Sequence, residues 1–282
     1  MSTIGFIGGG NMAGSLIAGL ISAGFSAANI TVAEPDEIRR QKLNQQFNVN
    51  TSAENNETLS CEIIILAVKP QLLKMVCQQL DSSKVSEPLF ISIAAGVKST
   101  DINRWLNNKN DNQLPGQTKA HAIIRCMPNT PALLRCGISG LFANDLVTDK
   151  QKQQAEQIMQ AVGIVIWVNK EEQLNAVTAV SGSGPAYFFL MMEAMQQAGE
   201  KLGLTTDIAQ QLVLQTALGA ARMATESDLS PAELRQKVTS KGGTTEQAIL
   251  SFQSAGFQQI VLRALEAAND RSISLADELG SD

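Results

Sequence analysis

A glycine turn near the N-terminus constrains the fold of this chain more than any other feature. The apolar run Ile4–Ile7 predicts a buried strand, which leads directly into Gly8-Gly9-Gly10 and then an apolar-periodic helix. This order of elements is typical of a dinucleotide site, because the turn admits the pyrophosphate and the helix N-terminus offers unpaired N–H groups. Ala13 stands at the third small position of the motif, where helix and strand pack closely. The alternative is a tight turn that binds no ligand.

Composition excludes several classes of function. The 282 residues are long enough for two domains, and the net charge of −5 without a basic cluster argues against a nucleic-acid partner. No apolar stretch is long enough to span a bilayer, and the N-terminus lacks the pattern of a signal peptide. The four cysteines have no Cys-x-x-Cys spacing, and His121 is the single histidine. We therefore expect a cytoplasmic protein with reduced thiols and no metal or membrane partner.

The first part of the chain alternates apolar runs with helical segments. Further strands are predicted at residues 30–33, 63–68, 89–93 and 122–127, with a helix at 36–46. Alternation of this kind predicts an α/β fold, a Rossmann-type doubly wound parallel sheet over residues 1–168, with ligands beyond the carboxyl ends of the strands. The asparagine-rich tract 107–117 is expected to be a surface loop.

The second part, residues 169–282, is predicted to be an all-helical domain. Candidate helices cover residues 185–199, 206–226, 231–238, 246–254 and 257–278. Helix N-caps are predicted at Thr206, at Ser230 and at Thr244 or Thr245. Several of these helices are apolar on more than one face, which a domain of this size cannot bury alone. We therefore expect a homodimer that shares these helices.

The end of the second strand bears on the identity of the cofactor. Glu34 stands where an acidic side chain accepts hydrogen bonds from the adenosine ribose hydroxyls, which favours NADH because a 2′-phosphate would be repelled. Arg39 and Arg40 follow closely and are able to bind that phosphate instead, although a solvated helix face explains at least one of them. The choice between NADP and NAD therefore stays open.

A second glycine turn lies in the helical part. Gly242 and Gly243 precede a threonine-rich helix start, so successive N–H groups converge on a point sized for a carboxylate. The hydroxyls of Ser240 and Thr245 would add donors, whereas a glycine C-cap followed by a new helix explains the pattern without a ligand. A third small-residue stretch, residues 181–187, begins a long helix and lacks the histidine context of a serine nucleophile.

Six segments together resemble the Δ1-pyrroline-5-carboxylate reductase family, in the same order and over nearly the whole chain: residues 6–12, 67–70, 93–97, 127–131, 181–187 and 242–245. The Met-Pro-Asn-Thr-Pro and Gly-Gly-Thr-Thr segments are the most specific. The resemblance implies NAD(P)H-dependent reduction of 1-pyrroline-5-carboxylate to L-proline, the last step of proline biosynthesis. It also implies a Rossmann domain joined to a helical dimerisation domain, with dimers that assemble into decamers in some members.

The resemblance also assigns site residues. Gly8, Gly9, Gly10, Asn11 and Met12 should hold the pyrophosphate, and the remaining cofactor site should comprise Asn55, Ala67, Val68, Lys69, Pro70, Ala94, Ala95, Gly96, Met127, Pro128 and Asn129. The substrate carboxylate should bind at Ser240, Gly242, Gly243, Thr244 and Thr245. The Thr245 hydroxyl should reach the ring nitrogen and orient it, since solvent can protonate the imine. The two glycine turns would then hold hydride donor and acceptor on opposite sides of a domain boundary.

Two departures from the family pattern affect these expectations. Lys241 stands where many members have proline, and Glu34 where many have a neutral or phosphate-binding residue. A β-hydroxyacid dehydrogenase is the alternative enzyme, but residues 184–190 lack the catalytic lysine of that class. A nucleotide-sensing module without catalysis would have no use for a second anion site.

Overall fold

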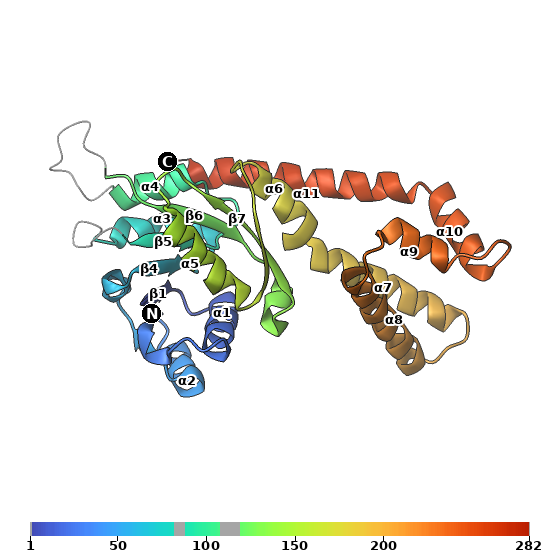
Figure 1. Ribbon diagram of the computed structural model, residues 1–282, viewed down its shortest axis with the longest axis horizontal. Helices are drawn as coiled ribbons and strands as arrows, with labels where there is room; N and C mark the ends of the chain where they lie inside the picture. Colours follow the sequence, from blue (N-terminus) through green and yellow to red (C-terminus); the bar gives the residue numbers. More distant parts are fainter. Residues whose placement is uncertain (1, 82–87, 108–118, 282) are drawn as a thin grey trace. The chain divides into compact units, whose positions relative to one another are not determined.

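The computed structural model describes residues 2–81, 88–107 and 119–281, and the chain forms two compact units. Unit 1 comprises Met1–Ser183 and Ala268–Asp282, and unit 2 comprises Gly184–Ala267 (Figure 1). Nearly all of the tract predicted as a surface loop, residues 108–117, lies outside the described residues. None of the helices in the described part of the chain has the length and apolar character needed to cross a membrane.

Unit 1 is built on one sheet of eight strands in the order β3-β2-β1-β4-β5-β6-β7-β8. The strands are β1 (Ile4–Ile7), β2 (Ile30–Ala33), β3 (Asn50–Ser52), β4 (Ile63–Leu66), β5 (Leu89–Ser92), β6 (Ile123–Met127), β7 (Gly137–Ala143) and β8 (Gly163–Trp167). The first six follow the dinucleotide-binding order 3-2-1-4-5-6, so the Rossmann-type prediction is confirmed. The sheet brings the carboxyl ends of β1, β2 and β4 together at the glycine turn.

The sheet differs from the predicted parallel arrangement at β7, which pairs antiparallel with β6. Residues 128–136 connect the two strands and contain a short 3-10 helix, Thr130–Leu134. A parallel return needs a crossover of a dozen or more residues, so this connection is too short for one. The antiparallel pairing follows from the length of that connection.

Helices cover both faces of this sheet (Figure 1). They are α1 (Asn11–Ser22), α2 (Glu37–Phe47), α3 (Pro70–Gln79), α4 (Ser99–Asn107), α5 (Asp149–Gln160) and α6 (Gln173–Val177). In β4, Ile63 and Ile65 join the core under α1, α2 and α5, whereas Ile64 and Leu66 join the core under α3 and α4. The continuous apolar runs of the sequence are therefore central strands buried on both faces.

Unit 2 is helical, as predicted, and continues into α11. Its helices are α7 (Gly184–Lys201), α8 (Thr206–Glu226), α9 (Pro231–Lys237), α10 (Thr244–Ser254) and the first part of α11 (Phe257–Gly280), whose residues from Ala268 onward belong to unit 1. The predicted cap at Ser230 is confirmed by a capping box with Glu233. The other predicted caps are wrong: Thr205 rather than Thr206 caps α8, and Gly243 precedes α10, whose first residues are Thr244 and Thr245.

The two compact units divide after Ser183, and the expected domain boundary at residue 168 stays a prediction. Residues up to Ser183 pack with unit 1, including α6 and the π-helical turn Thr178–Gly182. Val177 packs on Gly140 of β7, where a Cβ would lie 2.6 Å from its side chain. Asn175 also accepts a hydrogen bond from Ser272 at 2.9 Å, which returns the end of α11 to unit 1.

Large apolar side chains are exposed throughout unit 2. Phe188 is 70% exposed, and Phe189, Leu190, Leu212 and Leu214 are at least half exposed. In this fully described unit, only Gly184, Ala209 and Val213 are buried. Exposure of so many large apolar side chains is typical of an interface with another protein chain.

Candidate functional site

The turn after β1 has a backbone that only glycine fits. Gly8 has φ +99°, and a Cβ there would lie 2.7 Å from the Ala67 carbonyl oxygen. Gly8 donates its N–H to the Ala33 carbonyl at 2.8 Å, so the turn packs against both neighbouring strands. Gly10 differs, because a Cβ at that position would meet no atom within 4 Å. One glycine is therefore needed to build the turn, and the other leaves open space beside it.

The N-terminus of α1 is open to an anion. Gly10 is its N-cap and provides no side-chain hydrogen bond, and the first turn holds no acidic residue. The first N–H groups of a helix have no partner within the helix, and they carry the positive end of its dipole. This end of α1 suits the pyrophosphate of a dinucleotide.

A cavity of about 780 Å³ adjoins this turn. Seven of the predicted cofactor residues line it, namely Gly8, Gly10, Glu34, Asn55, Ala67, Val68 and Lys69. They come from segments far apart in the chain that meet at the carboxyl edge of the sheet, where doubly wound folds bind their ligands. These residues and this volume fit a dinucleotide.

The sequence analysis missed the apolar wall of this cavity. Leu72 and Met75 of α3 line it and are 45% and 50% exposed, although both are large apolar side chains. Their spacing of three places them on one face of the helix. An apolar pair at this spacing just after Lys69-Pro70 was the sequence signal that could have indicated them. An apolar wall of this kind suits the face of an adenine ring.

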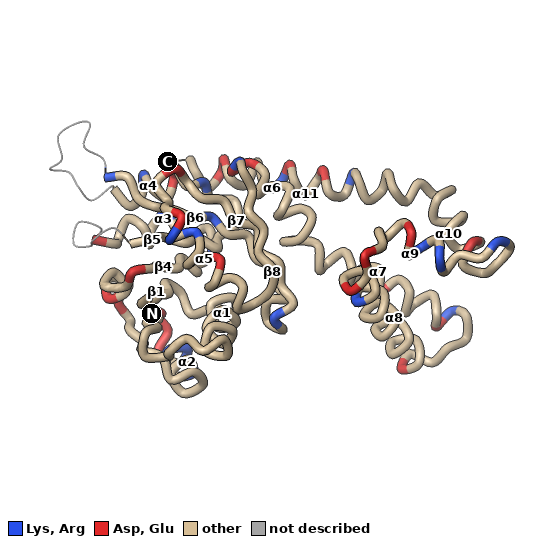
Figure 2. Tube along the Cα trace, viewed as in Figure 1, with Lys and Arg blue, Asp and Glu red and all other residues tan. Residues whose placement is uncertain are grey.

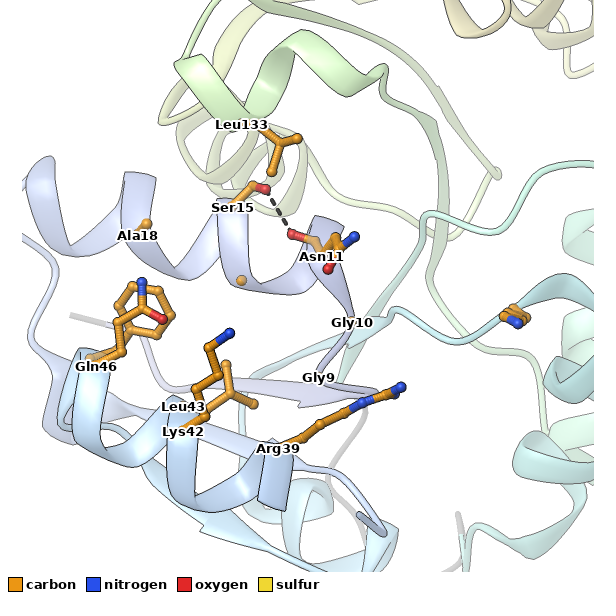
Figure 3. Close-up of a pocket in the computed structure, with 13 residues that line it drawn as sticks. Gly9, Gly10, Asn11, Ser15, Ala18, Arg39, Lys42, Leu43, Gln46 and Leu133 are labelled. Carbon is orange, nitrogen blue, oxygen red and sulfur yellow. Dashed lines mark hydrogen bonds between the residues drawn. The ribbon is translucent and has the colours of Figure 1, made fainter. Parts of the chain in front are cut away.

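A second cavity, of about 570 Å³, lies on the other side of the turn between α1 and α2 (Figure 3). Gly9, Gly10 and Asn11 line it together with three cationic side chains, Arg39, Lys42 and Lys69. In Figure 3, Arg39 extends from α2 alongside the Gly9–Gly10 turn. Arg39 and Lys69 line both cavities, so the positive charge reaches the first one as well.

Glu34 lies beneath the turn, and its carboxylate contacts backbone N–H groups. Oε2 accepts a hydrogen bond from Gly9 N–H at 2.8 Å, and Oε1 accepts one from Asp36 N–H at 3.2 Å. The residue is 5% exposed, so Glu34 supports the turn besides lining the cavity. Arg40 donates to the carbonyls of Glu34 and Pro35, both at 2.8 Å. Arg40 therefore holds the backbone of the loop, and Arg39 is the arginine that faces the cavities.

The remaining predicted cofactor residues lie outside the linings of these two cavities: Met12, Pro70, Ala94, Ala95, Gly96, Met127, Pro128 and Asn129. Ala94 to Gly96 follow β5, and Met127 to Asn129 follow the neighbouring β6, at the same edge of the sheet. Asn129 has a structural task, because its amide donates to the Ser181 carbonyl at 3.2 Å and accepts from Ile138 N–H at 3.0 Å.

The second glycine turn lies between α9 and α10 in unit 2. Gly242 has φ +73°, and its N–H donates to Glu246 Oε2 at 2.7 Å. Gly243 packs so closely on Ser240 that a Cβ there would lie 2.5 Å from the Ser240 hydroxyl oxygen. The turn thus already binds one carboxylate oxygen, that of Glu246. Thr245 is half-buried in the first turn of α10.

The cysteines are all free thiols in the structure. Burial raises the pKa of Cys77 and of Cys126 to about 12 and also raises that of Cys61, whereas Cys136 is exposed. Among the described residues, no group of three His, Cys, Asp or Glu side chains is placed to hold a metal ion.

Comparisons with known proteins agree with this geometry. Residues 171–275 match the family model for pyrroline-5-carboxylate reductase dimerisation, and residues 3–96 match that for NADP oxidoreductase, coenzyme F420-dependent. The chain is 51% identical to a pyrroline-5-carboxylate reductase of Pseudomonas aeruginosa, over 99% of this chain and 100% of that one. It is 45% identical to the one from Pasteurella multocida, over 96% of both chains.

Solved structures give the same result. A pyrroline-5-carboxylate reductase from Coxiella burnetii superposes with a TM-score of 0.89 at 45% identity, covering 98% of each chain. A pyrroline carboxylate reductase from Plasmodium falciparum with NADP bound superposes with a TM-score of 0.82 at 29% identity, again over 98% of each chain.

Proposed function

Since this chain belongs to the pyrroline-5-carboxylate reductase family and reduces 1-pyrroline-5-carboxylate to L-proline, we propose that its two glycine turns hold the two anionic reactants. The turn at Gly8 to Gly10 binds the pyrophosphate of the nicotinamide cofactor. The turn at Gly242 and Gly243 binds the carboxylate of the cyclic imine. Neither assignment requires a metal ion or a covalent intermediate.

The observation that supports the second assignment is the contact between Gly242 and Glu246. A carboxylate oxygen lies 2.7 Å from the Gly242 nitrogen, at the distance of a charge-assisted hydrogen bond. The Glu246 carboxylate stands in for the carboxylate of the substrate at this donor. The substrate therefore competes with Glu246 for the Gly242 N–H when it binds.

The work of the protein in this reaction is positioning. The bound cofactor supplies a hydride to the imine carbon, and a proton from solvent on the ring nitrogen makes that carbon electrophilic. Binding the substrate carboxylate at a rigid turn limits the motion of the ring, which raises the rate by orientation. The Thr245 hydroxyl, two residues after Gly243, orients the ring nitrogen and is not a strong acid.

For the cofactor we propose that both NADPH and NADH are used. Glu34 lines the cavity and is able to accept a hydrogen bond from a ribose hydroxyl, while Arg39 faces the same cavity with a charge that attracts a 2′-phosphate. Comparison of kcat/KM for the two cofactors tests this. A preference beyond about a hundredfold, which corresponds to about 2.7 kcal/mol, would contradict the proposal.

The enzyme is a homo-oligomer built through its dimerisation region, and we propose that the unit in solution is a dimer. The exposed apolar side chains of α7 and α8, Phe188 and Leu212 among them, would be buried between the subunits. We also propose that dimers assemble into a decamer and that the enzyme is located in the cytoplasm. Analytical ultracentrifugation at micromolar concentration tests the dimer, and a monomer of about 30 kDa would refute it.

One assay tests the proposed function as a whole. The enzyme is mixed with NADPH or NADH, and loss of the reduced cofactor is followed before and after addition of 1-pyrroline-5-carboxylate. Oxidation that depends on the imine, with proline as product, is the expected result. Cofactor binding without turnover would indicate a nucleotide sensor, and turnover only with a β-hydroxyacid and oxidised cofactor would indicate the alternative dehydrogenase.

A further inference from the structure

The loop between β5 and α4, residues 93–98, is held by contacts from two distant parts of the chain. It carries three predicted cofactor residues, Ala94, Ala95 and Gly96, and it leads into α4 at Ser99. Gly96 has φ +73°, a conformation that L side chains rarely adopt. The contacts that hold the loop in place come from Glu171 and from the last turns of α11.

The first contact holds the end of the loop at Ser99. Glu171 Oε1 accepts a hydrogen bond from Ser99 N–H at 2.6 Å, and its Oε2 accepts one from the Ser99 hydroxyl at 2.8 Å. Arg125 of β6 holds the same carboxylate through an ion pair of 3.0 Å, with both side chains less than one fifth exposed. Burial lowers the pKa of Arg125, and the Glu171 carboxylate opposes that shift. The carboxylate thus ties the start of α4 to the central sheet.

The second contact holds the middle of the loop. A Cβ at Gly96 would lie 3.1 Å from the Leu275 side chain, so Leu275 packs directly on the backbone of the loop. Asp277, two residues later in α11, forms an ion pair with Lys98 at 2.8 Å. Arg104 of α4 donates to the Gly280 carbonyl at 2.6 Å. Figure 2 shows charged residues of both signs where the end of α11 lies along α4.

These two contacts stand at the two ends of the dimerisation region, which matches the family over residues 171–275. Glu171 is its first residue and Leu275 its last. Both of these residues belong to unit 1, so the two ends of the matched region contact the same loop of that unit. Glu171 and Leu275 are separated by more than a hundred residues in sequence, yet both hold residues 96–99.

We propose that Glu171 and Leu275 are positioning residues for hydride transfer, which act by fixing the 93–98 loop of the cofactor site. The inference rests on the proposed function, because it takes Ala94 to Gly96 as cofactor residues of a reductase of this family. A displacement of about 1 Å at a reacting centre can cost about a hundredfold in rate. Two anchors that hold the loop from both ends of the dimerisation region limit such displacement and link that region to the cofactor.

Four variants of the full-length enzyme test this inference. Leu275→Ala removes the packing on Gly96, and Leu275→Met restores most of the volume. Glu171→Gln keeps one oxygen that can accept from the Ser99 N–H, but it replaces the other oxygen with a donor NH2 group and loses the charge that faces Arg125. Glu278→Gln is the matched control, because Glu278 is also paired with an arginine, Arg271, at 3.0 Å on α11, without an assigned contact to the loop.

We expect Leu275→Ala and Glu171→Gln to lower kcat/KM for NADPH by roughly tenfold or more while the enzyme stays dimeric. Calorimetric titration should show weaker NADPH binding in both variants, and this readout does not involve the imine. Leu275→Met and Glu278→Gln should match the wild type within about twofold, a difference of roughly 0.4 kcal/mol.

Unchanged kcat and KM in variants that merely melt at lower temperature would overturn the inference, since they would show that the anchors support only the fold. If Leu275→Ala does not fold, the inference is tested by comparing Glu171→Gln with Glu278→Gln in kcat/KM and in NADPH binding. If the wild type binds NADPH but does not reduce the imine, the proposed function fails instead. The NADPH titrations of the variants then still decide whether the anchors act on the cofactor.

Discussion

Two glycines in the first turn allow folding and cofactor binding to be separated by single substitutions. Gly8→Ala places a methyl group 2.7 Å from the Ala67 carbonyl oxygen, at a φ of +99° that alanine adopts only under strain. Backbone strain of this kind costs about 1–3 kcal/mol, and overpacking costs about as much again. We expect the free energy of unfolding to fall by about 2–6 kcal/mol and Tm to fall by at least about 4 °C.

Gly10→Ala should leave the stability of the fold nearly unchanged and weaken cofactor binding. Gly10 has φ −71° and ψ −176°, which alanine adopts freely, and a Cβ there meets no atom within 4 Å. Reduced freedom of the unfolded chain stabilises the variant by about 0.4–1 kcal/mol, and a poorer N-cap offsets that gain. The unfolding free energy should therefore stay within about 1 kcal/mol of the wild type. The added methyl group instead occupies space where we propose that the pyrophosphate binds.

The affinity of Gly10→Ala for NADPH measures the effect of this added methyl group. A steric cost of about 1–3 kcal/mol, comparable with overpacking in a core, raises Kd for NADPH by roughly 5- to 150-fold. Thermal melting of both variants without cofactor, followed by calorimetric titration with NADPH, gives the two quantities separately. The reasoning fails if Gly10→Ala binds NADPH like the wild type, or if it melts as low as Gly8→Ala.

Four further predictions follow from side chains at the two anion sites and from the thiols. Thr245→Ala should lower kcat/KM for the imine by roughly three- to tenfold, the value of one hydrogen bond, and leave residual activity; unchanged steady-state kinetics would remove Thr245 from the site. Glu246→Ala frees the Gly242 N–H and should lower KM for the imine, whereas a higher KM would mean that the Glu246 contact helps to build the site. Arg39→Ala should raise KM for NADPH and leave that for NADH nearly unchanged, and an equal loss for both would place Arg39 away from the 2′-phosphate. Burial disfavours the charged thiolate and raises the pKa of Cys77 to about 12, so at pH 8 a thiol reagent should modify exposed Cys136 first, as peptide mass mapping of the native enzyme would show.

Local pattern was sufficient to predict most of the elements. The run at residues 63–68 is apolar at every position, which indicates a strand buried on both faces, and β4 is such a strand. The alternation of strands and helices likewise predicted the doubly wound sheet. The short β3, Asn50–Ser52, was missed because it is polar and lies at the sheet edge, where burial imposes no apolar pattern.

Some site residues could likewise be predicted from local sequence, whereas others are revealed only by the fold. The Gly8 to Gly10 turn could be predicted because each glycine answers a local backbone requirement and its neighbours in sequence confirm it. Leu72 and Met75 were missed because their apolar character is typical of any helix, and only the position of α3 beside the cavity gives them a role. The sequence does not distinguish the roles of the adjacent Arg39 and Arg40. In the structure, Arg40 donates to the Glu34 carbonyl, whereas Arg39 lines the cavity.

The sequence by itself determined the family, the two glycine turns and the order of strands and helices, because each depends on local periodicity or on a short motif. Tertiary structure alone decided where side chains with no local preference find their partners. Glu34 binds the N–H of a glycine 25 positions away, Glu171 binds Ser99 over 72 positions, and Leu275 packs on Gly96. Contacts over such separations leave no periodic trace in the sequence, since each depends on the packing of the whole sheet unit and not on neighbouring residues.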